Sequence, residues 1–222
     1  MYRLLPLLLL LGLAPLEADT RFFRGDRERW EHLTSRLATI DFAIPSAGHD
    51  FIDFSTPRGL TIKGVTFVGV VDARVNDQGV ISCAQSSEHY VLQVVDPRAA
   101  PLLYDWGSKQ LLVGPAGVGI PCNYVLITLP PAVTAVGVDL MCRGHCRIEL
   151  STGDVTADPG FSVISAYPAE RQIGNILDVR VPTQRRPFLG MLSTTPITWI
   201  KLTSTAADIP IIIDNLAIGT AK

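Results

Sequence analysis

The sequence has no excess of positive charge. Its 222 residues hold 19 Lys and Arg against 21 Asp and Glu, for a formal net charge of -2, and no basic stripe is visible. Because nucleic-acid phosphates are bound by concentrated positive charge, nucleic acid is not an expected partner. Charged residues are sparse overall, at 18% against 47% hydrophobic residues, which excludes a disordered chain.

Long apolar runs are missing after the N-terminus. A helix that spans a bilayer needs about 20 apolar residues, so we expect no membrane span once a signal has been cleaved. Residues 1–18 are typical of a secretory signal peptide, with Arg3, a short apolar core over residues 4–13 and the small Ala18 before the expected cleavage point. An uncleaved membrane anchor or a buried helix is the alternative. The prediction is a secreted, periplasmic or cell-surface protein.

Catalytic signatures are also missing. No G-x-S-x-G, H-E-x-x-H or P-loop pattern occurs, and the four histidines are scattered through the chain. A glycan hydrolase needs two carboxylates that face each other across a cleft, and a sequence does not display such a cleft. Enzymatic activity therefore stays open, and a non-catalytic protein is favoured.

Cysteine is scarce. The four residues are Cys83, Cys122, Cys142 and Cys146, and an even number in an exported chain indicates two disulfides. Three pairings are possible. Closeness in sequence favours Cys142–Cys146, which leaves Cys83–Cys122. A metal site built from Cys142, His145 and Cys146 is the alternative, but it lacks a second ligand pair at a fixed spacing.

Helical periodicity is confined to an N-terminal extension over residues 19–38. Trp30, Leu33 and Leu37 fall on one face of a helix, and Asp26 is a suitable N-cap. We expect a short helix near Asp26–Leu37 that docks on the domain or on a partner. A loosely held extension is the alternative.

Residues 39–222 contain many short β-type runs separated by Gly and Pro, with no crossover helices between them. Parallel sheets require such helices, so the pattern predicts one all-β domain, an antiparallel β-sandwich of jelly-roll type. Residues 90–95 are expected to form one strand, and residues 97–121 a long loop. Residues 197–202 have the profile of a strand with one wet face. Ile211–Ile213 begins a last strand that is covered on both faces and seals the core.

A series of short motifs carries a resemblance. They lie at residues 39–42, 59–67, 129–140, 188–190, 196–200 and 214–219. Their order resembles that of the exported bacterial β-sandwich domains found in PEP-CTERM-type surface proteins. The resemblance covers residues 39–219 and implies a jelly roll similar to carbohydrate-binding modules. Only residues 220–222 follow these motifs, so we do not expect the C-terminal sorting signal of such proteins or surface anchoring by that route.

The resemblance also suggests a metal site. In carbohydrate-binding jelly rolls, acidic groups of the first and last strands often hold a structural Ca²⁺. Asp41 and Asp214 each stand between apolar residues, so they become candidate ligands, with Asn215 completing an oxygen shell. The alternative is that both carboxylates accept local backbone N–H bonds.

Aromatic residues supply the candidate ligand-binding site. Tyr104, Asp105 and Trp106 lie together in the expected long loop, where aromatic rings can stack on sugars and a carboxylate can accept hydroxyl hydrogen bonds. A loop that packs its own aromatics onto the sandwich is the alternative. Trp199 beside Lys201 is a further candidate if it faces outward instead of into the core.

These observations predict an exported, non-catalytic binding module whose partner is a glycan, with a possible structural calcium ion. The alternative is a structural or adhesive cell-envelope protein that acts through contacts with envelope proteins. A glycan hydrolase is the third hypothesis.

Overall fold

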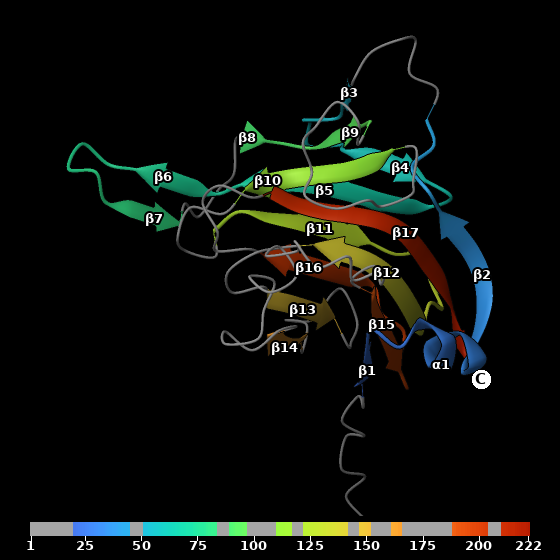
Figure 1. Cartoon of the computed structure of the whole chain (residues 1–222). Coiled ribbons are helices and arrows are strands. Elements are labelled where there is room, and N and C mark those ends of the chain that lie inside the picture. The colour runs from blue at the N-terminus through green and yellow to red at the C-terminus, as the bar shows by residue number, and fades with distance from the viewer. Residues whose placement is uncertain are drawn as a thin grey trace, which may run out of the picture.

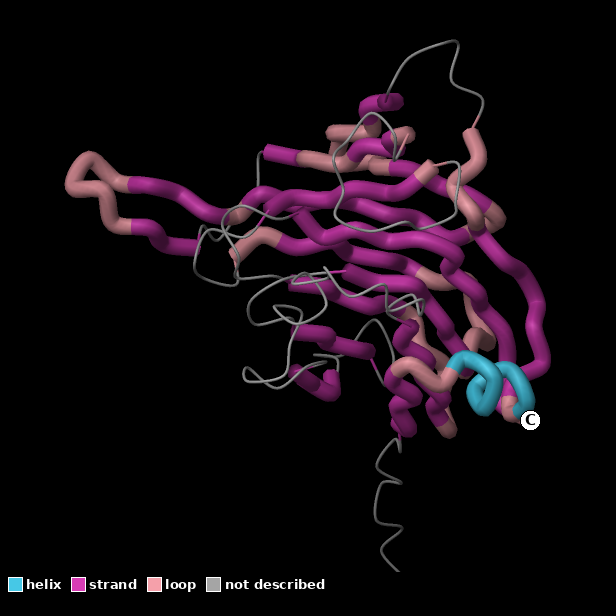
Figure 2. The backbone as a smooth tube through the Cα atoms, viewed as in Figure 1, coloured by secondary structure: helices cyan, strands magenta, loops and turns pink. Residues whose placement is uncertain are grey.

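The computed structural model describes residues 20–44, 51–83, 89–96, 110–116, 122–141, 147–151, 161–165, 188–203 and 210–222. These residues form two antiparallel β-sheets packed face to face, with a single short helix and one projecting hairpin (Figures 1 and 2). The all-β sandwich predicted from the strand pattern is therefore confirmed. Its jelly-roll connectivity stays a prediction.

The first sheet holds eight of the described strands. In spatial order seven of them are β1 (Thr20–Arg24), β15 (Phe188–Ser193), β12 (Ala135–Met141), β17 (Pro210–Ala221), β10 (Leu111–Ala116), β9 (Gln93–Val95) and β3 (Phe51–Asp53). The eighth, β2 (Thr34–Ile40), also pairs with β17. β17 thus pairs with three strands, β12, β10 and β2, and is a central strand of this sheet.

The second sheet holds seven described strands. In order six of them are β14 (Phe161–Ser165), β13 (Arg147–Ser151), β16 (Trp199–Thr203), β11 (Tyr124–Thr128), β5 (Val65–Val71) and β4 (Leu60–Ile62). The seventh, β8 (His89–Tyr90), pairs with β5. Lys63 and Gly64, both with positive φ, join β4 to β5 in a two-residue turn, as expected where a tight turn requires left-handed backbone.

The core lies between the two sheets as one continuous cluster of buried aliphatic and aromatic side chains. The first sheet contributes side chains such as Leu189, Met191 and Ile213, and the second contributes Phe67 and Ile200. Alternate residues of each strand point inward, which is the pattern expected when one face of a sheet is buried.

Two expectations for the middle of the chain are wrong. Residues 90–95 do not form one strand, because the chain breaks at Val91 and Leu92 and passes from β8 in the second sheet to β9 in the first. The expected loop over residues 97–121 contains a strand, β10, which pairs with both β9 and β17. β10 contains Gly114 and Pro115, and because these residues usually mark turns, the sequence pattern did not predict a strand there.

The N-terminal helix is shorter than expected. Helix α1 spans Arg27–His32, and Asp26 caps it by accepting a bond from the backbone N–H of Arg29. The expected continuation to Leu37 is wrong, because β2 begins at Thr34 and pairs with β17 over its whole length. Residues 20–24 and 34–40 are therefore strands of the first sheet on either side of a six-residue helix.

Trp30 fixes α1 to the outer face of the first sheet. Its ring is fully buried, its indole N–H donates to the carbonyl of Met191 at 3.2 Å, and its ring meets that of Phe188 edge to face. Beneath the ring lie Gly137 and Gly190, where an added Cβ would come within 2.8 and 2.5 Å of indole carbons. Two glycines on neighbouring strands thus make the hollow that receives the indole.

A hairpin formed by β6 (Ala73–Val75) and β7 (Ile81–Cys83) projects beyond the sandwich (Figure 1). Two adjacent residues outside the hairpin, Cys122 and Asn123, hold its base. Cys83 forms a disulfide with Cys122, which confirms that predicted pairing. The Asn123 side chain accepts from the backbone N–H groups of Asp72 and Ala73 and donates to the carbonyl of Ala116. The predicted Cys142–Cys146 pair lies outside the described residues.

None of the helices in the described ranges is both long enough and apolar enough to cross a membrane.

The Trp30 hollow leads to a first prediction. We expect Gly190→Ala to lower the free energy of unfolding by about 1–3 kcal/mol, because the new methyl group overlaps the indole ring and forces it from its seat. Chemical denaturation monitored by tryptophan fluorescence measures the change. Ser35→Ala, at an exposed position on β2, is the control and should stay within about 0.5 kcal/mol of the parent protein. A Gly190→Ala protein as stable as the control would contradict this packing.

Candidate functional site

The outer face of the second sheet follows from the register of its strands. The inward residues of β11 and β16, such as Val125 and Ile200, are buried in the core. The residues between them therefore face outward, since successive side chains of a strand alternate. Directly paired on this outer face are Thr128 with Trp199, Leu126 with Lys201, Tyr124 with Thr203, and Lys201 with Glu149.

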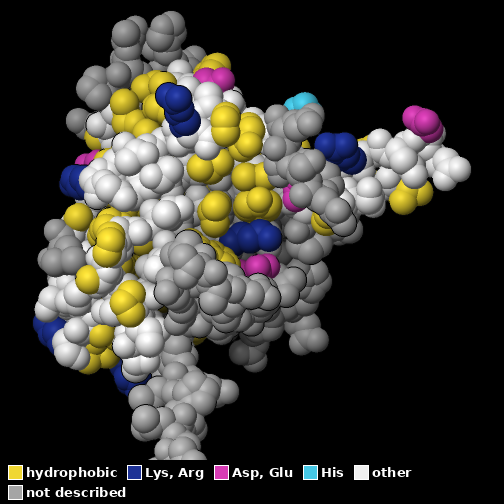
Figure 3. Space-filling model, turned by 180° about the vertical axis from the view of Figure 1, so that it is seen from behind, with side chains coloured by type: hydrophobic (Ala, Val, Ile, Leu, Met, Phe, Trp, Pro, Cys, Tyr) yellow, Lys and Arg dark blue, Asp and Glu magenta, His cyan; other side chains and the backbone are white. Residues whose placement is uncertain are grey.

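Aromatic, basic and acidic groups meet at the middle of this face. Trp199, Tyr124, Lys201 and Glu149 are all partly exposed. The Lys201 ammonium lies 4.4 Å from the centroid of the Tyr124 ring, a cation–π geometry that holds the ring and the charge together. We call Trp199, Tyr124, Lys201 and Glu149 the aromatic face. Seen from behind, the molecule shows hydrophobic side chains gathered beside a basic and an acidic side chain (Figure 3).

The aromatic face carries hydroxyl groups along one margin. Thr61 and Thr66 share a hydrogen bond of 3.0 Å across β4 and β5, and Thr66 pairs with Thr128 on β11. Thr128 in turn pairs with Trp199. A flat ring flanked by hydroxyl, ammonium and carboxylate groups offers stacking and hydrogen bonding to one polar ligand with an apolar side.

Trp199 faces outward and not into the core, which was the first of the two alternatives considered for it. Tyr104, Asp105 and Trp106, the other predicted ligand-binding residues, lie outside the described residues. Sequence reasoning missed Tyr124 and Glu149. The signal was present in the alternation of Tyr124, Leu126 and Thr128, but strand pairing is needed to bring that row beside Trp199.

A second polar group lies on the outer face of the first sheet, beside α1. Asp139 on β12 and Asp214 on β17 face each other across the strand pair, and they are only 1% and 0% exposed. The Arg27 guanidinium donates to Asp139 Oδ1 at 2.5 Å. Asn215 Nδ2 donates to Asp139 Oδ2 at 3.2 Å and to Asp214 Oδ2 at 2.7 Å. Burial of two carboxylates is tolerable because N–H donors compensate them.

This arrangement bears on the calcium prediction. Asp214 and Asn215 do lie together, but Asp41 is exposed and accepts a bond from the backbone N–H of Ala43. The described oxygens of Asp139 and Asp214 face N–H donors, and Arg27 brings a positive charge to the same place. These residues fit a hydrogen-bonded ion pair better than a Ca²⁺ shell, which needs six to eight oxygens. Within the described ranges no three His, Cys, Asp or Glu side chains gather as a metal-binding group.

Comparison with known proteins adds no relative. No family model matches the chain, and neither a curated protein nor a solved structure matches it. The resemblance to surface-protein sandwich domains therefore stays a prediction.

The Arg27–Asp139 pair leads to a second prediction. We expect Arg27→Gln to lower the free energy of unfolding by about 1–3 kcal/mol, because it leaves a buried carboxylate without its cation. This expected loss of stability is smaller than the loss for a fully buried ion pair, because the Arg27 side chain is 33% exposed and water screens its charge. Asp139→Asn in the same background should recover part of the loss, which a double-mutant cycle by chemical denaturation measures.

Arg29→Gln is the matched control, since Arg29 lies on the same helix and forms no ion pair with any described residue. If Arg27→Gln and Asp139→Asn change the free energy of unfolding additively, the ion pair between the two residues contributes nothing to stability. The same cycle run in EDTA and in added Ca²⁺ should give equal midpoints. A calcium-dependent rise that disappears in Asp214→Asn would instead support a metal at this place.

Proposed function

We propose that this protein is an exported, non-catalytic binding module that takes up a glycan on its aromatic face. The observation that supports this best is the juxtaposition of Trp199, Tyr124 and the Lys201–Glu149 pair on a partly exposed sheet surface. Aromatic rings stack against the apolar C–H side of a sugar ring. Lysine, glutamate and threonine groups at their margin can satisfy the sugar hydroxyls.

The position of the aromatic face on regular strands favours binding over catalysis. β11, β13 and β16 hold these side chains on a packed core, so the surface is preorganised and little entropy is lost when a ligand binds. The buried carboxylates Asp139 and Asp214 serve poorly as a hydrolase pair, because both are almost fully covered and N–H donors bind their oxygens. Export, the second part of the proposal, is supported by the predicted signal peptide and by the Cys83–Cys122 disulfide.

The third prediction tests the aromatic face. We expect Trp199→Ala to weaken binding to the best ligand of a broad glycan set at least about tenfold, because one stacking platform is lost. Titration calorimetry with the wild-type ligand measures the change. Phe51→Ala is the matched control, since Phe51 is an exposed aromatic residue on β3 of the other sheet. Equal binding by both variants would place the glycan elsewhere, and failure to bind any glycan of the set would contradict the proposal.

A second candidate function is supported by the projecting hairpin. Val75 and Ile81 face each other across β6 and β7, and together with Val80 they are three of the five most exposed large hydrophobic residues described. A lone two-stranded hairpin is marginally stable in water, yet this one is fastened at its base by a disulfide and by Asn123. A rigid prong with apolar side chains suits a structural or adhesive envelope protein that associates through protein contacts.

The fourth prediction concerns this hairpin. If the hairpin mediates association between copies of the protein, sedimentation velocity should show a weight-average sedimentation coefficient that rises with protein concentration. The double substitution Val75→Thr and Ile81→Thr should abolish that rise, because it removes apolar surface but keeps β-branched side chains. Val91→Thr, an exposed valine outside the hairpin, is the control. A wild-type protein that stays monomeric at all concentrations would contradict self-association.

A further inference from the structure

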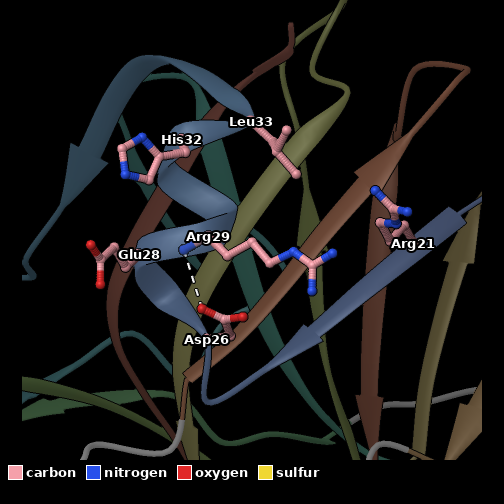
Figure 4. Close-up of a pocket in the computed structure, with 6 residues that line it drawn as sticks. All are labelled: Arg21, Asp26, Glu28, Arg29, His32 and Leu33. Atoms are coloured by element: carbon pink, nitrogen blue, oxygen red, sulfur yellow. Dashed lines mark hydrogen bonds between the residues drawn. The ribbon is translucent and has the colours of Figure 1, made fainter.

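An open hollow of about 390 Å³ lies beside α1, on the opposite side of the sandwich from the aromatic face. Figure 4 shows the side chains that line it. They are Arg21, Asp26, Glu28, Arg29, His32 and Leu33. The hollow is therefore rich in charge of both signs, with one apolar side chain among them.

Two guanidinium groups enter this hollow from different elements. Arg21 stands on β1, opposite Leu192 of β15, and its guanidinium lies 6.0 Å from the centroid of the Phe23 ring. Arg29 comes from the exposed side of α1, and its side chain extends away from the helix toward β1 (Figure 4). Because Trp30 anchors α1 to the sheet, the two elements that carry the arginines are held in fixed relation.

The two arginines have no ion-pair partner among the described residues. Arg27, two residues before Arg29, takes up the nearby carboxylates of Glu31 and Asp139. Asp26 uses its carboxylate to cap the helix at the backbone N–H of Arg29. The lining also holds the carboxylates of Asp26 and Glu28, so an anionic group would be attracted where it lies nearer the two guanidinium groups than these carboxylates.

We propose that this hollow binds the carboxylate-bearing ring of an acidic sugar, with Arg21 and Arg29 holding the carboxylate. The planar fork of a guanidinium matches a carboxylate in two parallel hydrogen bonds. The volume exceeds the needs of a bare ion and is sufficient for one sugar ring. Asp26 can accept hydrogen bonds from its hydroxyl groups and Leu33 offers an apolar contact, whereas Glu28 points to the other side of α1 (Figure 4).

This site is separate from the aromatic face, and the two are tested apart. Glucuronate is the probe, with glucose and acetate as the neutral-sugar and free-carboxylate comparisons, followed by chemical-shift titration of the full chain at low salt. We expect glucuronate to bind more tightly than either comparison. Arg21→Gln and Arg29→Gln should each weaken it about tenfold, because each removes one charge-assisted contact.

Arg58→Gln, at an exposed arginine away from the hollow, is the matched control and should bind as the wild type does. Trp199→Ala should also retain glucuronate binding, which separates this proposal from the one made for the aromatic face. The proposal is overturned if glucuronate binds no better than glucose or acetate, or if both arginine variants bind it as tightly as the control. Unchanged melting temperatures of the variants exclude loss of folding as the cause.

Discussion

A one-residue bulge in β17 is the constraint on which the rest of this structure depends. Asp214 pairs with Asp139 and Ala217 pairs with Gly137, so β17 has one more residue than β12 between these two pairs. Asn215 takes up the extra residue with a positive φ of 46°. Without it, Leu216 would share a face with Asp214, because strand side chains alternate with a period of two. The bulge thus returns Leu216 to the core.

The same bulge decides what lies on the outer face of the first sheet. It turns Ala217 outward, into the small cluster formed by Trp30, Phe188 and their neighbours. It also places the Asn215 amide where it donates to both buried carboxylates. α1 can therefore settle on this face with an apolar contact through Trp30 and an ionic contact through Arg27. Residues far apart in the sequence, on α1 and on β17, are joined in this way.

The sequence predicted those parts of the fold that depend on local pattern. The isoleucine run of β17 indicated a strand covered on both faces, and Asp26 indicated the start of α1, because burial and capping leave marks within a few residues. The end of α1 was not predictable in this way. Thr34 begins a strand because β17 offers it a pairing partner, and that partner lies almost 190 residues away in the sequence. Tertiary pairing there overrides a helical pattern that continues through Leu37.

The same distinction explains what could be inferred about the sites. Trp199 was found because a strand with alternating polar residues has an outer face, whereas Tyr124 and Glu149 reach it only through the register of three strands. Asp214 was singled out because apolar neighbours surround it, but its partners come from β12 and α1, which no local pattern connects. A pattern of residues marks a buried charge, and the chemistry of that charge is then set by whichever elements the fold brings to it.

Both proposed ligand sites follow from the way in which the sandwich covers its sheets. The first sheet has its outer face partly covered by α1, which leaves a hollow at the margin of the helix that Arg21 and Arg29 both line. The second sheet presents Trp199 and Tyr124 directly from its strands. A covered face gives charge and depth, whereas an uncovered one gives a broad stacking surface. The two proposals therefore assign different chemistry to the two faces: recognition of a carboxylate at one, and stacking on an apolar surface at the other.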